Sequence, residues 1–238
     1  MEMLEILNDL KNNHGACTLK TEFETEGATL EEALRLKNLA DAAGLGFAVK
    51  IGGAAAVKEI REAKALGASK IVAPMIESAY AFRKFIDSVR TVYTVDYPRP
   101  QLFINIETYA GAHSLYEILA FERARELSGI VFGRTDMCGS LGYCPEDVEC
   151  EKILYHAKDI SHKAHLYGKK FFAGGGISPK SVDFLNSIPN LDGWETRKVI
   201  FNAPATSEAI LKAIKFEMMW LESLGRESER IEVLKTRT

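Results

Sequence analysis

Short segments rich in β-branched and aromatic residues alternate with helix-patterned stretches, and this alternation restricts the possible fold more than any other feature of the chain. The segments read CTLKTEFE, GFAVKIGG, KIVAPMIE, QLFINIE, GIVFGRTD, GKKFFAGGG and RKVIF, and they begin near Cys17, Gly46, Lys70, Gln101, Gly129, Gly168 and Arg197. Their spacing of roughly 25 to 40 residues is that of βα units. The alternation therefore predicts a parallel sheet covered by helices.

A chain of 238 residues that carries these repeats is expected to form one α/β domain, over residues 1–238, of the TIM-type (β/α) barrel kind. Seven strands can be read from the sequence, one fewer than a closed eightfold barrel needs, so the eighth strand stays unassigned. A flavodoxin-like doubly wound sheet is the alternative, but it normally uses fewer repeats in a shorter chain.

Helices are predicted between and around the strands. Thr29 stands three residues before Glu32, the spacing of a capping box, and an apolar stripe follows it. The segment 1–12, with leucines at helical spacing, is expected to be an N-terminal helix. Residues 207–224 form a broad apolar face that ends at Gly225, and the charged residues 226–238 are expected to form a solvated end.

The C-terminal helix leaves two arrangements open. It is either the last helix of its own barrel or a helix exchanged between subunits. Met218, Met219, Trp220 and Leu221 crowd apolar area onto it, which favours a subunit interface. We therefore expect a closed, symmetric homo-oligomer.

Composition excludes several classes of protein. Apolar residues make up 47% of the chain and charged residues 26%, as in an ordinary globular enzyme, and a net charge of -3 gives no basic surface for nucleic acid. The N-terminal residues interrupt any apolar run with acidic side chains, and no stretch is long enough to span a membrane. A cytoplasmic protein without nucleic-acid or membrane partners is expected. Its four cysteines, which include no C-x-x-C pair, are expected to be free thiols.

Polar side chains at the carboxyl ends of the strands are the first candidates for chemistry, because β/α barrels carry their active sites there. Alternation in QLFINIET places Phe103, Asn105 and Glu107 on one face, and Asp136 follows GIVFGRTD at the same level. Two carboxylates at one barrel mouth need a cation or a shared proton, and a hard cation such as Mg²⁺ suits oxygen ligands. A surface ion pair at a strand end is the other interpretation of either residue alone.

The order of three motifs, APMIES, INIET and GIVFGRTDMCGSLG, resembles the HpcH/HpaI aldolase and citrate lyase family. The resemblance covers residues 20–142 best. It implies a β/α barrel, a divalent metal (Mg²⁺, Mn²⁺ or Co²⁺) held by Glu107 and Asp136, and chemistry through a pyruvate-like or acyl-CoA enolate. It also implies trimers or hexamers with C-terminal helices at the subunit contacts.

Two positions depart from the family pattern. The segment Glu22-Phe23-Glu24-Thr25 stands where the aldolases carry D-x-E-H, so Thr25 replaces their histidine. Lys50 stands where the family usually has an arginine, and an ammonium lacks the planar fork of a guanidinium. Lys50 is expected to be an electrostatic clamp for the enolate, in preference to a solvated lysine or a Schiff-base nucleophile. Lys20, Glu22 and Glu24 alternate onto one face and either line the mouth or form a structural network.

Further candidates follow two strands. Gly133, Arg134 and Ser140 flank Asp136 and are expected to contact substrate. Gly174 and Gly175 open a glycine-rich turn in which Ser178 is the expected N-cap and Pro179 the first helical residue, so the turn either binds a phosphate or carboxylate or serves only as a tight turn. The five histidines show no metal-ligand spacing, and His162 and His165 are expected on a helix surface.

These features together predict a Mg²⁺- or Mn²⁺-dependent carbon–carbon lyase or aldolase that acts on a 4-hydroxy-2-oxo acid through a pyruvate-like enolate. Without the histidine, the proton is carried by a water molecule at the metal or by Glu22 or Glu24. Two alternatives remain open: an acyl-CoA lyase of the citrate lyase β type, and a barrel that binds a carboxylate ligand without turning it over.

Overall fold

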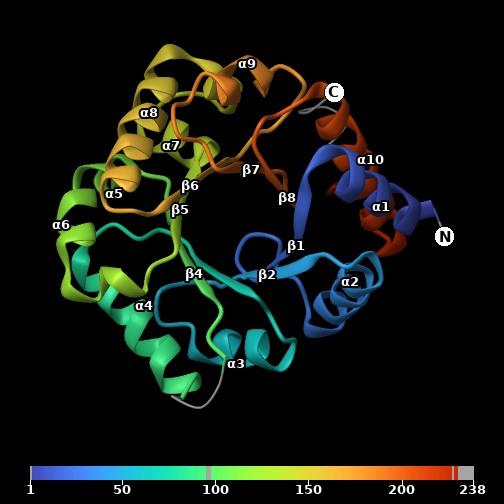
Figure 1. The fold of residues 1–238 in the computed structure, drawn as a ribbon, viewed down its shortest axis with the longest axis horizontal. Coiled ribbons are helices and arrows are strands. Elements are labelled where there is room, and N and C mark those ends of the chain that lie inside the picture. Colours follow the sequence, from blue (N-terminus) through green and yellow to red (C-terminus); the bar gives the residue numbers. More distant parts are fainter. Residues whose placement is uncertain (1, 95–97, 227, 230–238) are drawn as a thin grey trace.

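The computed structural model describes residues 2–94, 98–226 and 228–229, and its strands form a closed barrel surrounded by helices (Figure 1). The strands are β1 (Ala16–Glu22), β2 (Gly46–Lys50), β3 (Lys70–Ala73), β4 (Gln101–Ile106), β5 (Gly129–Gly133), β6 (Lys170–Gly174), β7 (Gly193–Glu195) and β8 (Val199–Asn202). The predicted β/α barrel is confirmed, and the strand that the sequence left unassigned is β7.

Helices cover the outside of the barrel between successive strands (Figure 1). They are α1 (Glu2–His14), α2 (Leu30–Ala43), α3 (Val57–Ala65), α4 (Ala79–Val92), α5 (Tyr109–His113), α6 (Leu115–Ala120), α7 (Arg134–Ser140), α8 (Glu151–Leu166), α9 (Ser181–Asn186) and α10 (Ser207–Ser223), with 3-10 turns at Glu122–Glu126 and Pro145–Glu149. The capping box is confirmed: Glu32 N donates to Thr29 Oγ1 at 3.2 Å, and Thr29 N donates to Glu32 Oε2 at 2.8 Å. None of the helices described is long and apolar enough to cross a membrane.

The prediction of an all-parallel sheet is wrong at the last strand. β1 to β7 are parallel, but β8 runs antiparallel to both of its neighbours, β7 and β1. Only residues 196–198 separate β7 from β8, whereas a parallel crossover needs about a dozen residues or more. The two strands therefore form a hairpin, with Trp194 opposite Phe201 and their rings stacked 4.0 Å apart.

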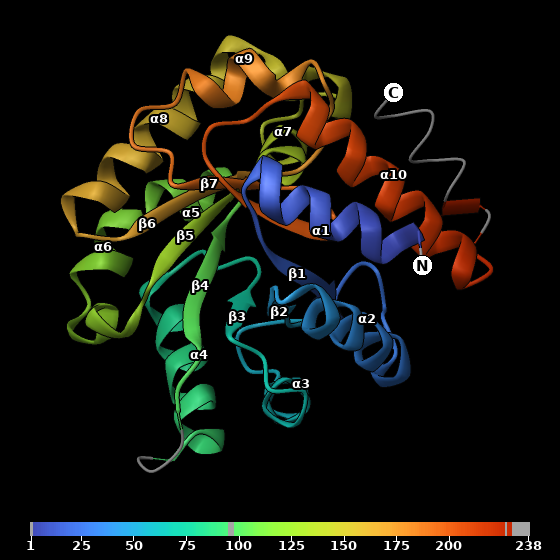
Figure 2. The same cartoon turned by 45° about the vertical axis from the view of Figure 1, so that its right-hand side comes forward.

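The reversed strand changes how the barrel is covered. After β8 the chain is at the amino-terminal end of the barrel, so α10 runs back toward the mouth beside α1, as Figure 2 shows. Lys215 on α10 lies 2.9 Å from Glu2 on α1, and Leu7 and Leu10 of α1 are buried. Both terminal helices were predicted from the sequence, and α1 packs against α10, α2 and β1.

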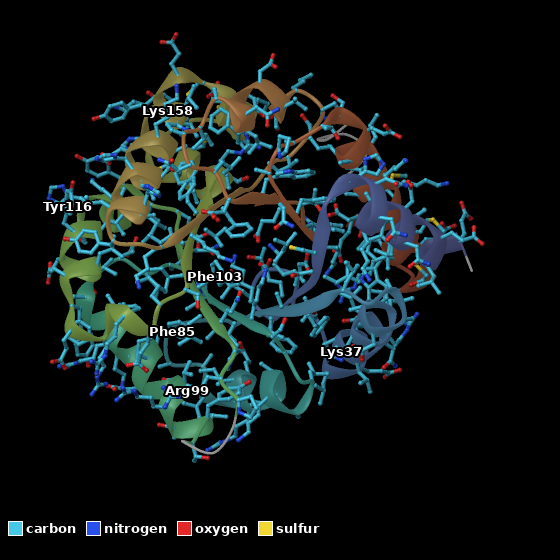
Figure 3. The ribbon with its side chains drawn as sticks, viewed as in Figure 1. Lys37, Phe85, Arg99, Phe103, Tyr116 and Lys158 are labelled. Carbon is cyan, nitrogen blue, oxygen red and sulfur yellow. The ribbon has the colours of Figure 1, made fainter. Side chains whose placement is uncertain are left out.

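The inside of the barrel divides into an apolar floor and a polar mouth. The floor is a cluster of buried side chains to which each of several strands contributes: Ala48, Val72, Phe103, Val131, Phe172 and Ile200. Phe103, near the centre of the ring in Figure 3, meets Phe172 edge-on at 5.6 Å between ring centroids. A separate and larger apolar core fills the space between the strands and the helices. The apolar floor therefore separates the amino end of the barrel, where Lys70 Nζ lies over the Phe103 and Phe172 rings, from the polar groups at the carboxyl ends of the strands.

The predicted homo-oligomer would use the apolar surface that α10 leaves exposed. Trp220 and Leu221 are buried within the chain, so they contribute less free apolar surface than expected, and Leu211 is the large apolar side chain that α10 leaves half exposed. We expect light scattering to report a multiple of 26.4 kDa, and Leu211→Glu to lower that mass because a charge would be buried at the contact. Leu166→Glu, on the exposed end of α8, is the control that keeps the native mass. A full-length chain of 26.4 kDa at micromolar concentration would contradict the homo-oligomer.

Candidate active site

A cavity of about 680 Å³ opens at the carboxyl ends of the strands. Its walls carry many ionisable side chains, which include residues of β1, β2 and β7, the residue directly after β4 and the first turn of α7. Val131 closes its inner end toward the apolar floor. The cavity therefore lies where the position of the strand ends predicted it.

Glu107 is the deepest carboxylate of the cavity. Alternation along β4 turns Asn105 and Glu107 inward above Phe103, and Glu107 is only 2% exposed. Its Oε1 accepts a hydrogen bond from the Met75 backbone at 2.9 Å, and its Oε2 accepts one from Asn105 Nδ2 at 2.8 Å. Burial raises the pKa of Glu107 above its ordinary value, although Lys50 acts to lower it. The carboxylate is held in one orientation by two donors that do not neutralise it.

Asp136 stands next to Glu107 at the more open side of the cavity. It belongs to the first turn of α7, and it lies close enough to Glu107 for the two carboxyl groups to affect each other's pKa. Desolvation raises the pKa of Asp136, the charge of Glu24 adds to this, and Lys50 opposes it. The structure thus brings together the two carboxylates that the strand ends predicted.

This pair fits a hard divalent cation. In the described part of the chain, no group of three or more His, Cys, Asp or Glu side chains is arranged to hold a metal, so the protein would supply two carboxylates, and water or substrate the remaining ligands. Asn105 Oδ1, beside Glu107, is buried without a hydrogen-bond partner. An uncompensated oxygen and two carboxylates with raised pKa values are what a cation would relieve.

Lys50 ends β2 and lies between the carboxylates of the mouth. Its Nζ is 2.6 Å from Glu24 Oε2 and 3.5 Å from Glu22 Oε1. Burial lowers the pKa of the ammonium, but Glu107, Glu22 and Glu24 outweigh burial and raise the pKa above its ordinary value. Lys50 is therefore a cation fixed beside Glu107.

Glu22 and Glu24 differ although both contact Lys50. Burial acts to raise the pKa of Glu22, but Lys20 and Lys50 lower it below the ordinary value. Burial raises the pKa of Glu24, and its contact with Lys50 does not fully compensate. Glu22 lines the cavity, and Glu24 lies half-buried in the loop after β1. Lys20 and Glu22 line the mouth, and Lys20, Glu22 and Glu24 also form ion pairs with Glu195 or Lys50. The two alternatives that the sequence left open, a lining of the mouth and a structural network, therefore both apply. Thr25, at the position of the family histidine, also lines the cavity.

Arg134 and Ser140 flank Asp136 in sequence but lie apart from the cavity lining described here. Arg134 is fully buried, where its Nη1 is 2.9 Å from Glu149 Oε2 and its Nε donates to the Gly175 carbonyl at 3.0 Å. Ser140 Oγ accepts a hydrogen bond from the Tyr109 backbone at 2.8 Å. In this chain Arg134 joins the turns after β5 and β6, which positions the loops around the mouth.

The glycines that the sequence singled out do line the cavity: Gly133 ends β5, and Gly174 and Gly175 end and follow β6. The expected helix start after them is wrong, because α9 begins at Ser181 and not at Pro179. Ser181 Oγ accepts from the Ser178 backbone at 3.1 Å and bonds Glu149 Oε1 at 2.5 Å. The 178–181 turn is thus held by tertiary contacts that no local capping signal reveals.

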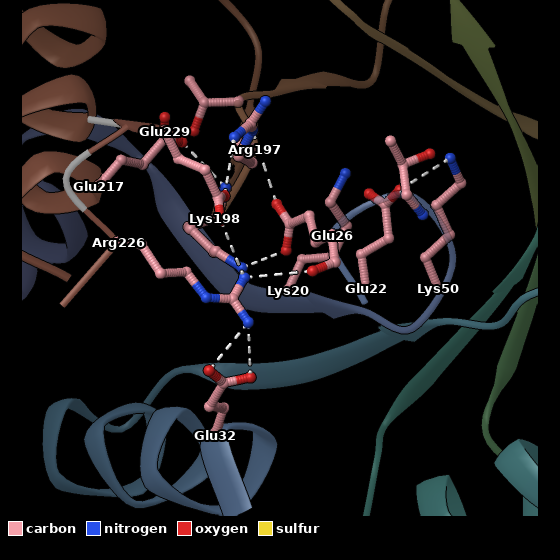
Figure 4. A network of polar contacts seen from close by, with 12 residues as sticks. Lys20, Glu22, Glu26, Glu32, Lys50, Arg197, Lys198, Glu217, Arg226 and Glu229 are labelled. Carbon is pink, nitrogen blue, oxygen red and sulfur yellow. Dashed lines mark hydrogen bonds and ion pairs between the residues drawn. The ribbon is translucent and has the colours of Figure 1, made fainter. Parts of the chain in front are cut away.

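The sequence did not single out the charges of the β7–β8 hairpin. Figure 4 shows Glu26, from the loop after β1, between Arg197 and Lys198, and Glu26 forms ion pairs with both. Glu217 of α10 accepts a hydrogen bond from the Lys198 backbone at 2.9 Å. Glu195 is a charged residue at the end of β7. If β7 had been recognised in the sequence, Glu195 would have been a candidate for the same reason as Glu107.

The C-terminal segment is tied to the same network. Arg226 binds both oxygens of Glu32, at 2.9 and 3.0 Å, and donates to the Glu26 carbonyl at 3.1 Å (Figure 4). The expectation of a solvated end is therefore wrong at Arg226, and residues 230–238 lie outside the described part of the chain. The histidine and cysteine expectations hold: His162 and His165 are exposed on α8, and the cysteines are free.

The chain is an α/β barrel with a pair of carboxylates at its mouth, and its sequence shows to which family it belongs. The chain belongs to the HpcH/HpaI aldolase/citrate lyase family, whose profile matches residues 34–174. No curated protein sequence matches the chain.

Solved structures share the fold at low sequence identity. An HpcH/HpaI aldolase from Desulfitobacterium hafniense DCB-2 is similar with a TM-score of 0.65 and 15% identity, over 82% of this chain and 81% of that one. An HpcH/HpaI aldolase/citrate lyase family protein from Burkholderia cenocepacia J2315 gives a TM-score of 0.66 and 12% identity, over 92% and 90%. The citrate synthase SbnG gives a TM-score of 0.63 and 16% identity, over 94% and 90%.

Proposed function

We propose that the protein is a divalent-metal-dependent carbon–carbon lyase or aldolase that acts on a 4-hydroxy-2-oxo acid through a pyruvate-like enolate. The observation that carries this proposal is the pair of Glu107 and Asp136 beside Lys50 at the mouth of the barrel. Family membership supports the reaction type. A 2-oxo acid is the expected substrate, because its carboxylate and keto oxygens suit a cationic site.

Glu107 and Asp136 would hold Mg²⁺ or Mn²⁺. Bound there, the cation would act as a Lewis acid on the oxygens of the developing enolate. The protein fixes the orientation of Glu107 through hydrogen bonds from the Met75 backbone and the Asn105 side chain. It also contributes a cavity whose inner carboxylates and Lys50 are buried, so their charges act more strongly than in water.

Lys50 would stabilise the same negative charge from the neighbouring strand. Its raised pKa keeps the amine protonated, and a protonated amine cannot attack a carbonyl. This supports the clamp role over the Schiff-base role. Glu24 and Glu22 hold the ammonium in place, so a substrate carboxylate or enolate would meet a positioned cation.

In the cleavage direction, a base removes the proton of the 4-hydroxyl group and the C3–C4 bond breaks. The aldehyde leaves, and the electron pair of the broken bond forms the enolate, which takes up one proton at C3 to give pyruvate. Glu22 and Glu24 are the candidates for carrying this proton: Glu22 lines the cavity but its pKa is lowered, whereas burial raises the pKa of Glu24, which lies in the loop after β1.

A pyruvate-release screen over 4-hydroxy-2-oxo acids, with Mg²⁺ or Mn²⁺ added, tests the function. We expect release that a chelator abolishes, and no adduct on Lys50 when borohydride is added with pyruvate, because a metal-stabilised enolate needs no covalent amine. A borohydride adduct on Lys50 that forms in chelator would replace this mechanism with an imine one. Cleavage of 3-hydroxyacyl-CoA esters in place of oxo acids would favour the acyl-CoA lyase, and binding without cleavage would favour the non-catalytic barrel.

A further inference from the structure

The wall of the cavity opposite the two carboxylates carries an ion pair that the proposed reaction leaves unused. In the closed ring of strands, β8 lies across from β4 and β1 lies across from β5. Lys20 comes from β1 and Glu195 from β7, the two neighbours of β8, and both side chains line the cavity. They therefore face Glu107, which directly follows β4, and Asp136, which lies in the first turn of α7 after β5.

The pair is built into the barrel. Lys20 and Glu195 are each only 5% exposed, and Lys20 Nζ donates a hydrogen bond to Glu195 Oε1. Glu195 is held in place because β7 ends in the tight hairpin and because β6 packs closely against it: a Cβ on Gly174 would lie 2.9 Å from Glu195 Cγ. The pair has little freedom to move away from a ligand.

Lys20 and Glu195 can each form further hydrogen bonds. Within the described residues, Lys20 Nζ has no hydrogen-bond partner besides Glu195 Oε1, and Glu195 Oε2 accepts no hydrogen bond. An ammonium carries three donors and a carboxylate accepts at both oxygens. The wall thus presents a charged donor next to a charged acceptor toward the cavity.

Such a wall selects one kind of ligand group. A second carboxylate would be repelled by Glu195, and an ammonium by Lys20. An alkyl group would displace water from both charges without replacing its hydrogen bonds. A hydroxyl group can accept from Lys20 and donate to Glu195 at the same time, so it satisfies both.

We propose that Lys20 and Glu195 form a subsite for a hydroxyl group on the aldehyde component, so that the substrate class is a 2-oxo acid hydroxylated beyond the carbon that is cleaved. This inference rests on the proposed aldolase function. It assigns the metal-side wall to the pyruvate part and the Lys20–Glu195 wall to the aldehyde part of the substrate.

The test compares two aldehydes in the addition of pyruvate, with Mg²⁺ present. Glyceraldehyde carries hydroxyl groups that propionaldehyde lacks. We expect the wild type to prefer glyceraldehyde in kcat/KM, and Glu195→Gln and Lys20→Met each to reduce that preference about tenfold or more, mainly through KM, because charge-assisted hydrogen bonds are lost. Lys180→Met, an exposed lysine at the rim, is the control that keeps the preference.

Two outcomes would overturn the subsite. One is a preference that stays unchanged in both variants, and the other is an equal loss for both aldehydes, as a purely structural ion pair would give. If the wild type shows no aldol activity at all, the proposed function fails. Saturation-transfer NMR in the presence of chelator then tests the subsite independently of the reaction. A glyceraldehyde signal that is weaker with Glu195→Gln than with the wild type supports the subsite. Equal signals with both proteins overturn the subsite.

Discussion

Glu107→Gln and Asp136→Asn are each expected to abolish stoichiometric Mn²⁺ binding in calorimetry and to reduce pyruvate release by more than about 100-fold, since loss of even an outer-shell partner of a metal site costs 10- to 100-fold. Either change leaves a hard cation with a single fixed carboxylate. Both substitutions preserve the size of the side chain. Burial disfavours the charged form of both carboxyl groups and so raises their pKa values, and the fold should therefore tolerate a neutral amide in their place.

Glu146→Gln provides the matched control, because Glu146 is an exposed carboxylate of the same cavity. It lowers the negative charge of the mouth by the same amount and should retain Mn²⁺ binding. Circular dichroism of the three variants separates loss of the site from loss of the fold. Full Mn²⁺ affinity in both Glu107→Gln and Asp136→Asn would show that the metal binds elsewhere.

Gly133→Ala is expected to have a comparable effect without touching an ionisable group. A Cβ at position 133 would lie 2.6 Å from Glu107 Oε2 and 2.7 Å from Glu107 Cβ, closer than packed atoms can approach. Glu107 must then move, and a displacement of about 1 Å at a reacting group can cost on the order of 100-fold in rate. Activity and Mn²⁺ affinity should fall together in the purified variant.

Gly139→Ala gives the comparison in α7, the helix that directly follows Gly133. A Cβ there meets nothing within 4 Å, and alanine favours a helix over glycine by about 1 kcal/mol, so activity should be unchanged and thermal stability unchanged or higher. If Gly133→Ala kept wild-type activity, the position of Glu107 would not limit the reaction.

The parts of the fold that could be predicted are those in which local pattern and tertiary environment agree. Alternation along β4 gave the placement of Phe103 in the floor and of Asn105 and Glu107 in the cavity, because a period of two is fixed by the strand itself. The capping box at Thr29 is a local motif and was predicted for the same reason.

The hairpin could not be predicted because its signals are weak. β7 is three residues long, and its turn contains neither Gly, Asn, Asp nor Pro, the residues that usually mark hairpins. Arg197 and Lys198 were predicted as the start of one strand, RKVIF, and the direction of that strand was then assigned by analogy with the other repeats. Without β7, the Lys20–Glu195 wall could not be recognised.

Arg134 shows a different limit. Its neighbours in sequence point to the cavity, but a buried guanidinium needs partners, and Glu149 and the Gly175 carbonyl supply them. Those partners come from segments that only the tertiary structure brings near. Sequence order alone therefore could not separate a substrate contact from a support of the loops.

The reversed strand also determines the order in which the barrel can assemble during folding. β7 and β8 are joined locally, and hairpins form within about 10 μs, whereas the β8–β1 contact joins Cys17 to Ile200 across 183 positions. Closing so long a loop costs on the order of 4 kcal/mol more chain entropy than closing a short turn. We therefore expect the hairpin to form before it docks on β1, and until then one edge of β1 is open and can pair with other chains. During synthesis that edge is exposed from an early stage, because β1 is made first and the strand that protects it is made last.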